Sequence, residues 1–188
     1  MCGIVGYIGH RDAFPIVIKG LKRLEYRGYD SAGVAVIKEE LKVFKKAGKV
    51  SDLENFVGNS DTTGTIGIGH TRWATHGKPT LSNAHPHQFG AVSVVHNGII
   101  ENFRELRREL SEHNIHAETD TDTETIAMLT GHFIAKGQSP TDAARSTLKK
   151  LDGAFAVCFL FAGHDDLMIA ARKGSPLAIG YGKGEMFV

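Results

Sequence analysis

A cysteine at position 2 is the residue with the most distinctive chemistry in the sequence. Removal of Met1 in front of this small residue would make Cys2 the first residue, which would then carry both a thiol and a free α-amine. A thiol of pKa about 8.5 is mostly protonated at neutral pH, whereas an α-amine of pKa about 7.7 to 8.0 can accept its proton. The position indicates an N-terminal nucleophile. The alternative is a small residue in a buried strand.

An Asn-Gly pair follows the alternating residues Val92 and Val94, and we expect Asn97 and Gly98 to lie where a strand turns into a helix. Asn-Gly is commonly a turn pair. The alternative is an oxyanion hole, because the Asn amide and the adjacent backbone N–H can donate to the same developing negative oxygen.

Charged residues in two further segments could bind an amino acid. Arg72, with Thr75 and His76 nearby, offers donors that suit a carboxylate, although a solvated surface arginine is equally common. Asp120 and Asp122 precede an expected helix, where an aspartate either stabilises the helix N-terminus or binds an ammonium group. A cationic side chain that binds a carboxylate, together with a carboxylate that binds an ammonium group, would form a binding site for an α-amino acid.

Metal and nucleotide sites are not indicated by the sequence. The histidines at 85, 87 and 96 have no second cysteine or carboxylate at metal-ligand spacing, and there is no HExxH, P-loop or GxGxxG pattern. We therefore predict no metal and no cofactor. Cys158 lies in an apolar run and is expected to be a buried, inert thiol.

The composition excludes several function classes. The 188 residues carry a net charge of +1, with 41% hydrophobic and 23% charged residues, as in an ordinary globular protein. No charge excess indicates binding to nucleic acid or to an anionic membrane. The longest apolar runs reach about half of the ~20 residues that a membrane-spanning helix needs, and no export signal is evident. We expect one cytoplasmic domain.

The elements that must position these residues alternate between strands and helices. Strands are expected at 2–9, 32–36, 41–43, 66–70, from 92, and at 154–162, 167–171 and 177–179. Helices are expected from Asp12 to near Gly28, and at the starts marked by Ser51 with Glu54, Asn102 with Glu105, Thr121 with Glu124, and Ser139-Pro140. Residues 71–90 show no period, as is typical of a functional loop. The order predicts α+β layers with the sheets inside.

Several long segments together resemble one family. They are CGIVGYIG from Cys2, LKRLEYRGYDSAG from Leu21, GHTRWATHGKP from Gly69, NAHPH from Asn83, VVHNGIIENFRELR from Val94 and TDTETIAML from Thr121. They resemble the glutamine-hydrolysing domain of the glutamine–fructose-6-phosphate aminotransferase family, a branch of the class II glutamine amidotransferases, which are N-terminal nucleophile hydrolases. The segments EYRGYDSAG and TRWATHG favour this branch over three related families: the amidotransferase of purine synthesis, asparagine synthetase and glutamate synthase.

The resemblance implies a role for each candidate residue. Cys2 would be the nucleophile and its α-amine the base, and Asn97 with the Gly98 N–H would form the oxyanion hole. The glutamine carboxylate and amine would each have their own set of residues. These are Arg72, Thr75 and His76 for the α-carboxylate, and Asp122 with Gly98 for the α-amine; the doubled Asp-Thr leaves Asp120 as a competitor to Asp122.

Three further residues would support the site. Trp73 resembles the loop aromatic that shields it, Arg27 resembles the residue that buttresses the N-terminal cysteine, and His85 matches a family histidine whose role stays open.

The implied fold is a four-layer αββα sandwich of two mainly antiparallel sheets with helices outside. The implied reaction hydrolyses L-glutamine to glutamate and ammonia through a Cys2 thioester without a cofactor. Residues 2–188 are expected to be a glutaminase domain that is truncated at its C-terminus. The sugar-phosphate isomerase domain of the full enzyme is expected to be absent here. The full-length enzyme is expected to be a homo-oligomer. The alternatives are a catalytically silent glutamine-binding or assembly module, and the glutaminase domain of another amidotransferase.

Overall fold

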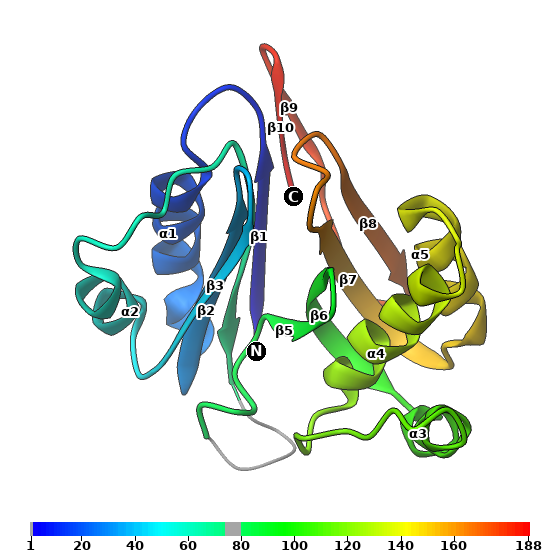
Figure 1. The fold of residues 1–188 in the computed structure, drawn as a ribbon. Coiled ribbons are helices and arrows are strands. Elements are labelled where there is room, and N and C mark those ends of the chain that lie inside the picture. The colour runs from blue at the N-terminus through cyan, green and yellow to red at the C-terminus, as the bar shows by residue number, and fades with distance from the viewer. Residues whose placement is uncertain (1, 74–79) are drawn as a thin grey trace.

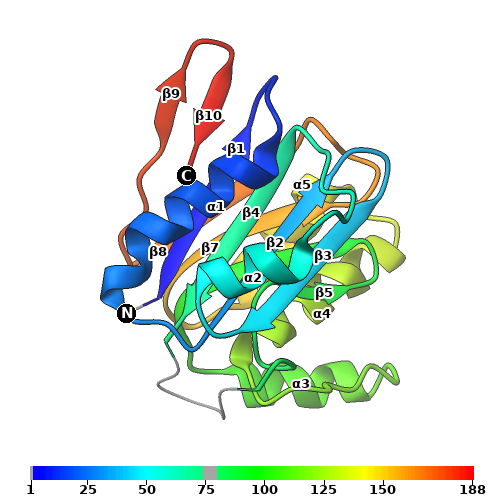
Figure 2. The same ribbon diagram turned by 90° about the vertical axis from the view of Figure 1, so that its left-hand side faces the viewer.

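Two antiparallel sheets lie face to face, with helices on their outer faces (Figures 1 and 2). The computed structural model describes residues 2–73 and 80–188. From one side of Figure 1 to the other, the layers are helix, sheet, sheet and helix. The predicted four-layer α+β sandwich is confirmed.

The first sheet has six strands in the order β3-β2-β4-β1-β10-β9. Its strands are β1 (Gly3–Ile8), β2 (Ser31–Ile37), β3 (Leu41–Ala47), β4 (Ile66–Arg72), β9 (Gly180–Gly182) and β10 (Glu185–Phe187). Helices α1 (Ala13–Leu24) and α2 (Val50–Val57) cover its outer face, and the 3-10 turn η1 (Glu25–Arg27) follows α1 directly. Cys2 directly precedes β1 of this sheet.

The second sheet has four strands in the order β5-β6-β7-β8. They are β5 (His87–Phe89), β6 (Val92–Ile100), β7 (Gly153–Phe161) and β8 (Met168–Lys173). Helices α4 (Asp122–Ala135) and α5 (Pro140–Lys150) cover its outer face, while α3 (Phe103–Ser111) lies beyond the end of β6 (Figure 1). Within the described residues, no helix is both long enough and apolar enough to cross a membrane.

Strand alternation decides which side chains enter the space between the sheets. On β6, Val92 and Val94 belong to the core under α4, whereas Val95 belongs to the core between the sheets. Because successive side chains of a strand point to opposite faces, His96 shares the helix side and Asn97 faces the first sheet. On β4, Ile66 and Ile68 belong to the core between the sheets, and by the same rule the side chains of residues 70 and 72 point to that side as well.

One predicted strand end and one predicted strand are wrong. Asn97 and Gly98 do not end a strand, because β6 continues to Ile100 and Gly98 pairs with Phe155 of β7. The strand expected at 177–179 is absent from the described structure; the chain forms the short hairpin of β9 and β10 instead. Because β9 contains glycines at 180 and 182, its sequence lacks the apolar alternation by which a strand is predicted.

Three predicted capping pairs are also wrong, although their helices form. At α2, Asp52 rather than Glu54 accepts the cap bond, from the Lys49 N–H. Asn102 bonds across to the 150–152 turn, and Glu124 accepts from the 118 and 119 N–H groups, which lie before the helix. The predicted Ser139 cap is confirmed, since its hydroxyl accepts from the Asp142 N–H.

Candidate functional site

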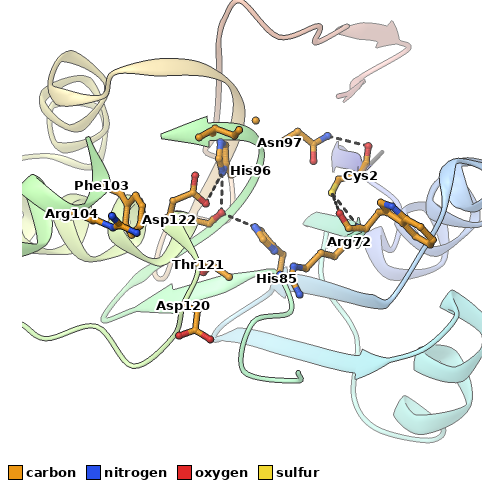
Figure 3. Close-up of a pocket in the computed structure, with 14 residues that line it drawn as sticks. Cys2, Arg72, His85, His96, Asn97, Phe103, Arg104, Asp120, Thr121 and Asp122 are labelled. Atoms are coloured by element: carbon orange, nitrogen blue, oxygen red, sulfur yellow. Dashed lines mark hydrogen bonds and ion pairs between the residues drawn. The ribbon is translucent and has the colours of Figure 1, made fainter. Parts of the chain in front are cut away.

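A cavity of about 300 Å³ opens between the two sheets beside the N-terminus. It is lined by Cys2, by the end of β4, by the end of β6 and by the segment that enters α4 (Figure 3). Cys2, Arg72, Asn97, Gly98 and Asp122 all line it, although they are far apart in the sequence. The fold therefore brings together most of the candidate residues.

The Cys2 side chain is held against the end of β4. Its Sγ accepts a hydrogen bond from the Trp73 N–H at 3.2 Å and lies 3.6 Å from the Trp73 carbonyl oxygen. From the other sheet, Asn97 Nδ2 donates to the Cys2 carbonyl oxygen at 3.4 Å. The sulfur and the Asn97 amide thus occupy the same wall of the cavity (Figure 3).

Gly98 has a backbone that only glycine can adopt without strain. Its φ is 121°, and a Cβ atom there would lie 2.1 Å from the Ala154 carbonyl oxygen on the neighbouring strand. Any side chain would have to push β6 away from β7. The glycine therefore permits a local twist of β6 directly beside Asn97.

The two candidate aspartates differ in their partners. Asp122 Oδ2 accepts from the Ile100 N–H at 2.7 Å, and its Oδ1 lies 4.0 Å from His96 Nδ1. Asp120 bonds instead to Asn83, which donates to its carboxylate at 3.4 Å and accepts from its N–H at 3.1 Å. Both line the cavity, but the Asp120 carboxylate points away from Asn97 (Figure 3).

Arg72 is nearly buried at the cavity wall and has an acidic neighbour that the sequence did not suggest. The whole residue is 4% exposed, and its Nη1 lies 3.7 Å from Asp30 Oδ1. The β2–β4 register, which pairs Ser31 with Arg72, brings Asp30 to this place. The sequence contains no local signal for a contact between positions 30 and 72.

The other predicted supporting residues lie at different depths. Trp73 lines the cavity and is 49% exposed, and its ring lies so close to Gly28 that a Cβ there would be 2.5 Å from it. Arg27 lies in η1, partly buried, and is not among the residues that line the cavity. Thr75 and His76 fall outside the described residues.

A group of buried histidines lies at the cavity, and two of them, His85 and His96, line it. His85 Nε2 and His96 Nδ1 lie 2.8 and 2.9 Å from the same Thr123 Oγ1, and the His85 ring stacks on His70 at 4.1 Å. Burial lowers the pKa of His70 and of His87 to about 3 and also lowers the pKa of His85 and His96. These rings are therefore neutral at physiological pH. Among the described residues, no cluster of three His, Cys, Asp or Glu side chains could hold a metal ion.

The second cysteine has no access to the cavity. Cys158 lies in the core between the sheets with no exposed surface, and burial raises the pKa of its thiol to about 12. It is a packing residue, as predicted, and it provides an internal control for thiol chemistry.

Comparison with known proteins adds independent information. Residues 70–188 match a family model described as a glutamine amidotransferase domain. The whole chain is 50% identical over 190 residues to a glutamine–fructose-6-phosphate aminotransferase (isomerizing) of Gluconobacter oxydans, and 53% identical over 189 residues to that of Mesorhizobium japonicum. The chain spans 31% of the length of these relatives.

Solved structures agree with this similarity. The chain superposes on glutamine phosphoribosylpyrophosphate amidotransferase from B. subtilis with a TM-score of 0.85 and 27% identity, covering 100% of this chain and 41% of that one. A glutamine aminotransferase class-II domain protein from Silicibacter pomeroyi has the same fold, with a TM-score of 0.63 and 14% identity.

Proposed function

The chain belongs to the glutamine amidotransferase family, as its sequence predicted, and from this premise we propose that it hydrolyses the side-chain amide of L-glutamine at the cavity between its sheets. The observation that carries the proposal is the common wall formed by Cys2 Sγ, the Asn97 amide and Gly98. A nucleophile and two donors for a developing oxyanion are the minimum equipment for acyl transfer.

In the proposed reaction, Met1 has been removed and the α-amine of Cys2 accepts the thiol proton. The sulfur attacks the glutamine side-chain carbonyl carbon, and the C–O π electrons move to oxygen. Asn97 Nδ2 and the Gly98 N–H donate to this oxyanion, which raises the rate because they act most strongly in the transition state. The intermediate collapses, the C–N bond breaks, and the α-ammonium group gives its proton to the leaving amide nitrogen as ammonia.

Hydrolysis of the thioester repeats the same steps with water. The α-amine takes a proton from water as the hydroxyl attacks the carbonyl carbon, and the oxyanion returns to the same two donors. Breaking of the C–S bond releases glutamate, and the proton returns to the sulfur. The cycle balances without a cofactor.

Recognition of the amino acid would use further residues that line the same cavity. We assign the α-carboxylate to Arg72, together with Thr75 and His76 as the resemblance implies, and the α-ammonium to Asp122 with Gly98. Support for Asp122 over Asp120 comes from the direction of its carboxylate and from the Asn83 contacts that occupy Asp120. Trp73 would close over the substrate, and Arg27 would support the N-terminal turn from outside the cavity.

Ammonia released here would serve a further reaction. The two relatives reported above are named glutamine–fructose-6-phosphate aminotransferases, and this chain matches 31% of their length. We therefore propose that the chain acts as the glutaminase domain of a cytoplasmic, homo-oligomeric enzyme whose sugar-phosphate isomerase domain converts fructose 6-phosphate to glucosamine 6-phosphate. Identity of 50% or more to this group, against 27% to the phosphoribosylpyrophosphate enzyme, favours the sugar acceptor.

The test is selective alkylation followed by a glutaminase assay. The chain without Met1 should convert glutamine to equal amounts of glutamate and ammonia, and iodoacetamide should abolish this by modifying Cys2. The buried Cys158 provides the matched control, because Cys158→Ala should keep both the activity and its sensitivity to iodoacetamide. A folded, Met1-free chain that makes no glutamate would instead support the silent glutamine-binding module.

A further inference from the structure

The Asn97 side chain can face the cavity in two ways that differ in polarity. Its amide oxygen and nitrogen are nearly the same size, so packing alone does not select between them. Only the orientation that presents Nδ2 could stabilise a negative oxygen, whereas Oδ1 would repel it. Something behind Asn97 must therefore select the orientation.

A buried histidine makes that selection. His70 Nε2 lies 2.9 Å from Asn97 Oδ1 and 3.1 Å from the carbonyl oxygen of His96. The backbone oxygen can only accept a hydrogen bond, so Nε2 must carry a proton. The same proton is then shared with Asn97, which must present its oxygen to His70 and its nitrogen to the cavity. The contact of Nδ2 with the Cys2 carbonyl oxygen agrees with this orientation.

The surroundings of His70 maintain this proton position. Its side chain is 1% exposed, and Nδ1 is buried without a hydrogen-bond partner among the described residues. A proton on Nδ1 would leave a buried donor unsatisfied, which is costly. The His85 ring stacks on His70 at 4.1 Å with an interplanar angle of 20°, and this contact restrains the plane of the imidazole.

We propose that His70 is a positioning residue for the glutaminase reaction, which orients the Asn97 amide so that Nδ2 faces the reacting carbonyl oxygen. This inference rests on the proposed function of the cavity. The His96 carbonyl selects the tautomer of His70, and His70 in turn selects the orientation of Asn97. His70 does not line the cavity, and its hydrogen bond to Asn97 is the contact through which we expect it to affect the rate.

A double-mutant cycle tests this dependence. His70→Leu should lower kcat about tenfold with little change in KM, as expected for the loss of one orienting hydrogen bond. This is less than the loss of about 10² to 10³ expected for Asn97→Ala. In the Asn97→Ala background the same His70→Leu change should alter kcat less than twofold. His70→Gln, which retains an N–H donor of similar reach, should recover most of the activity.

A matched control separates positioning from general damage to the core. His87 is equally buried but bonds to Thr121, so His87→Leu should have the same effect on kcat in both backgrounds. A His70→Leu effect that is equal in both backgrounds would overturn the proposal, as would an unchanged kcat. Wild-type activity in the same assays reports on the proposed function itself.

A spectroscopic readout tests the geometry without any activity. In ¹⁵N-labelled protein at pH 7, His70 should show the neutral tautomer with its proton on Nε2, and this N–H should exchange more rapidly in Asn97→Ala. A proton on Nδ1 would overturn the inference even if glutamine is hydrolysed. This measurement also applies if His70→Leu fails to fold, because it uses the wild-type ring.

Discussion

Acidification should destabilise this protein well before its carboxylates titrate. Four histidines that are at most 6% exposed lie at or next to the cavity: residues 70, 85, 87 and 96. Burial lowers the pKa of His70 and His87 from an ordinary value of 6.5 to about 3. In the unfolded chain these rings bind protons below pH 6.5, whereas in the folded chain they stay neutral. Stability is therefore complete above pH 6.5 and is lost as the pH falls toward 3.

The size of the effect follows from these two histidines. Each contributes a loss of about 1.4 kcal/mol of unfolding free energy per pH unit once the unfolded ring is fully protonated. At pH 5, about 1.5 units below the ordinary value, the loss is about 2 kcal/mol each and about 4 kcal/mol together. His85 and His96 add to this in the same direction. This loss is a large fraction of the total stability of about 5 to 15 kcal/mol that is typical of a domain.

Urea unfolding at a series of pH values from 7.5 to 5 measures this loss. The window lies above the pH at which carboxylates in the unfolded chain titrate, so it isolates the histidines. His87→Gln should reduce the slope by about 1.4 kcal/mol per pH unit. His164→Gln, at an exposed histidine, provides the matched substitution outside this buried group. An unfolding free energy that is the same at pH 7.5 and pH 5 would refute the reasoning.

Three substitutions at the cavity have separable outcomes. Gly98→Ala should destabilise the fold by about 2 kcal/mol or more, seen as a lowered Tm, because a positive φ and the Ala154 oxygen both oppose a side chain; an unchanged Tm would show that β6 shifts freely. Asn97→Ala should lower kcat by about 10² to 10³ with a small change in KM, and an effect on KM alone would assign it to substrate binding. Asp122→Asn should raise KM more than Asp120→Asn, and the opposite order would place the ammonium group at Asp120.

The parts of the fold that could be predicted are those in which apolar alternation and burial coincide. Val92 and Val94 belong to the buried core of β6, and the run from 154 belongs to β7, whose side chains are mostly buried. The helix starts at Asn102, Thr121 and Ser139 were also correct, but α2 starts before Ser51, and none of the three predicted capping pairs forms. Side chains such as Asn102 had other donors and acceptors available once the chain was folded, and no local rule ranks those partners.

The candidate site was predicted only as far as local motifs reach. Cys2, Arg72, Asn97 and Asp122 come from separate segments, and the structure places them around one cavity. His70 could have been noticed, because it continues the alternation of the strand that leads to Arg72. Asp30 could not, because its contact with Arg72 depends on the register of β2 against β4, which is set by the packing of the whole sheet.

The proposed reaction requires Cys2 to act as an N-terminal nucleophile, with its own α-amine as the base. The most direct test compares glutamate production by two forms of the same chain, one beginning at Cys2 and one in which Met1 is retained, with mass spectrometry to verify each N-terminus. We expect turnover by the first form and loss of turnover in the second, because an amide nitrogen cannot accept the thiol proton. Equal turnover by the two forms would contradict it.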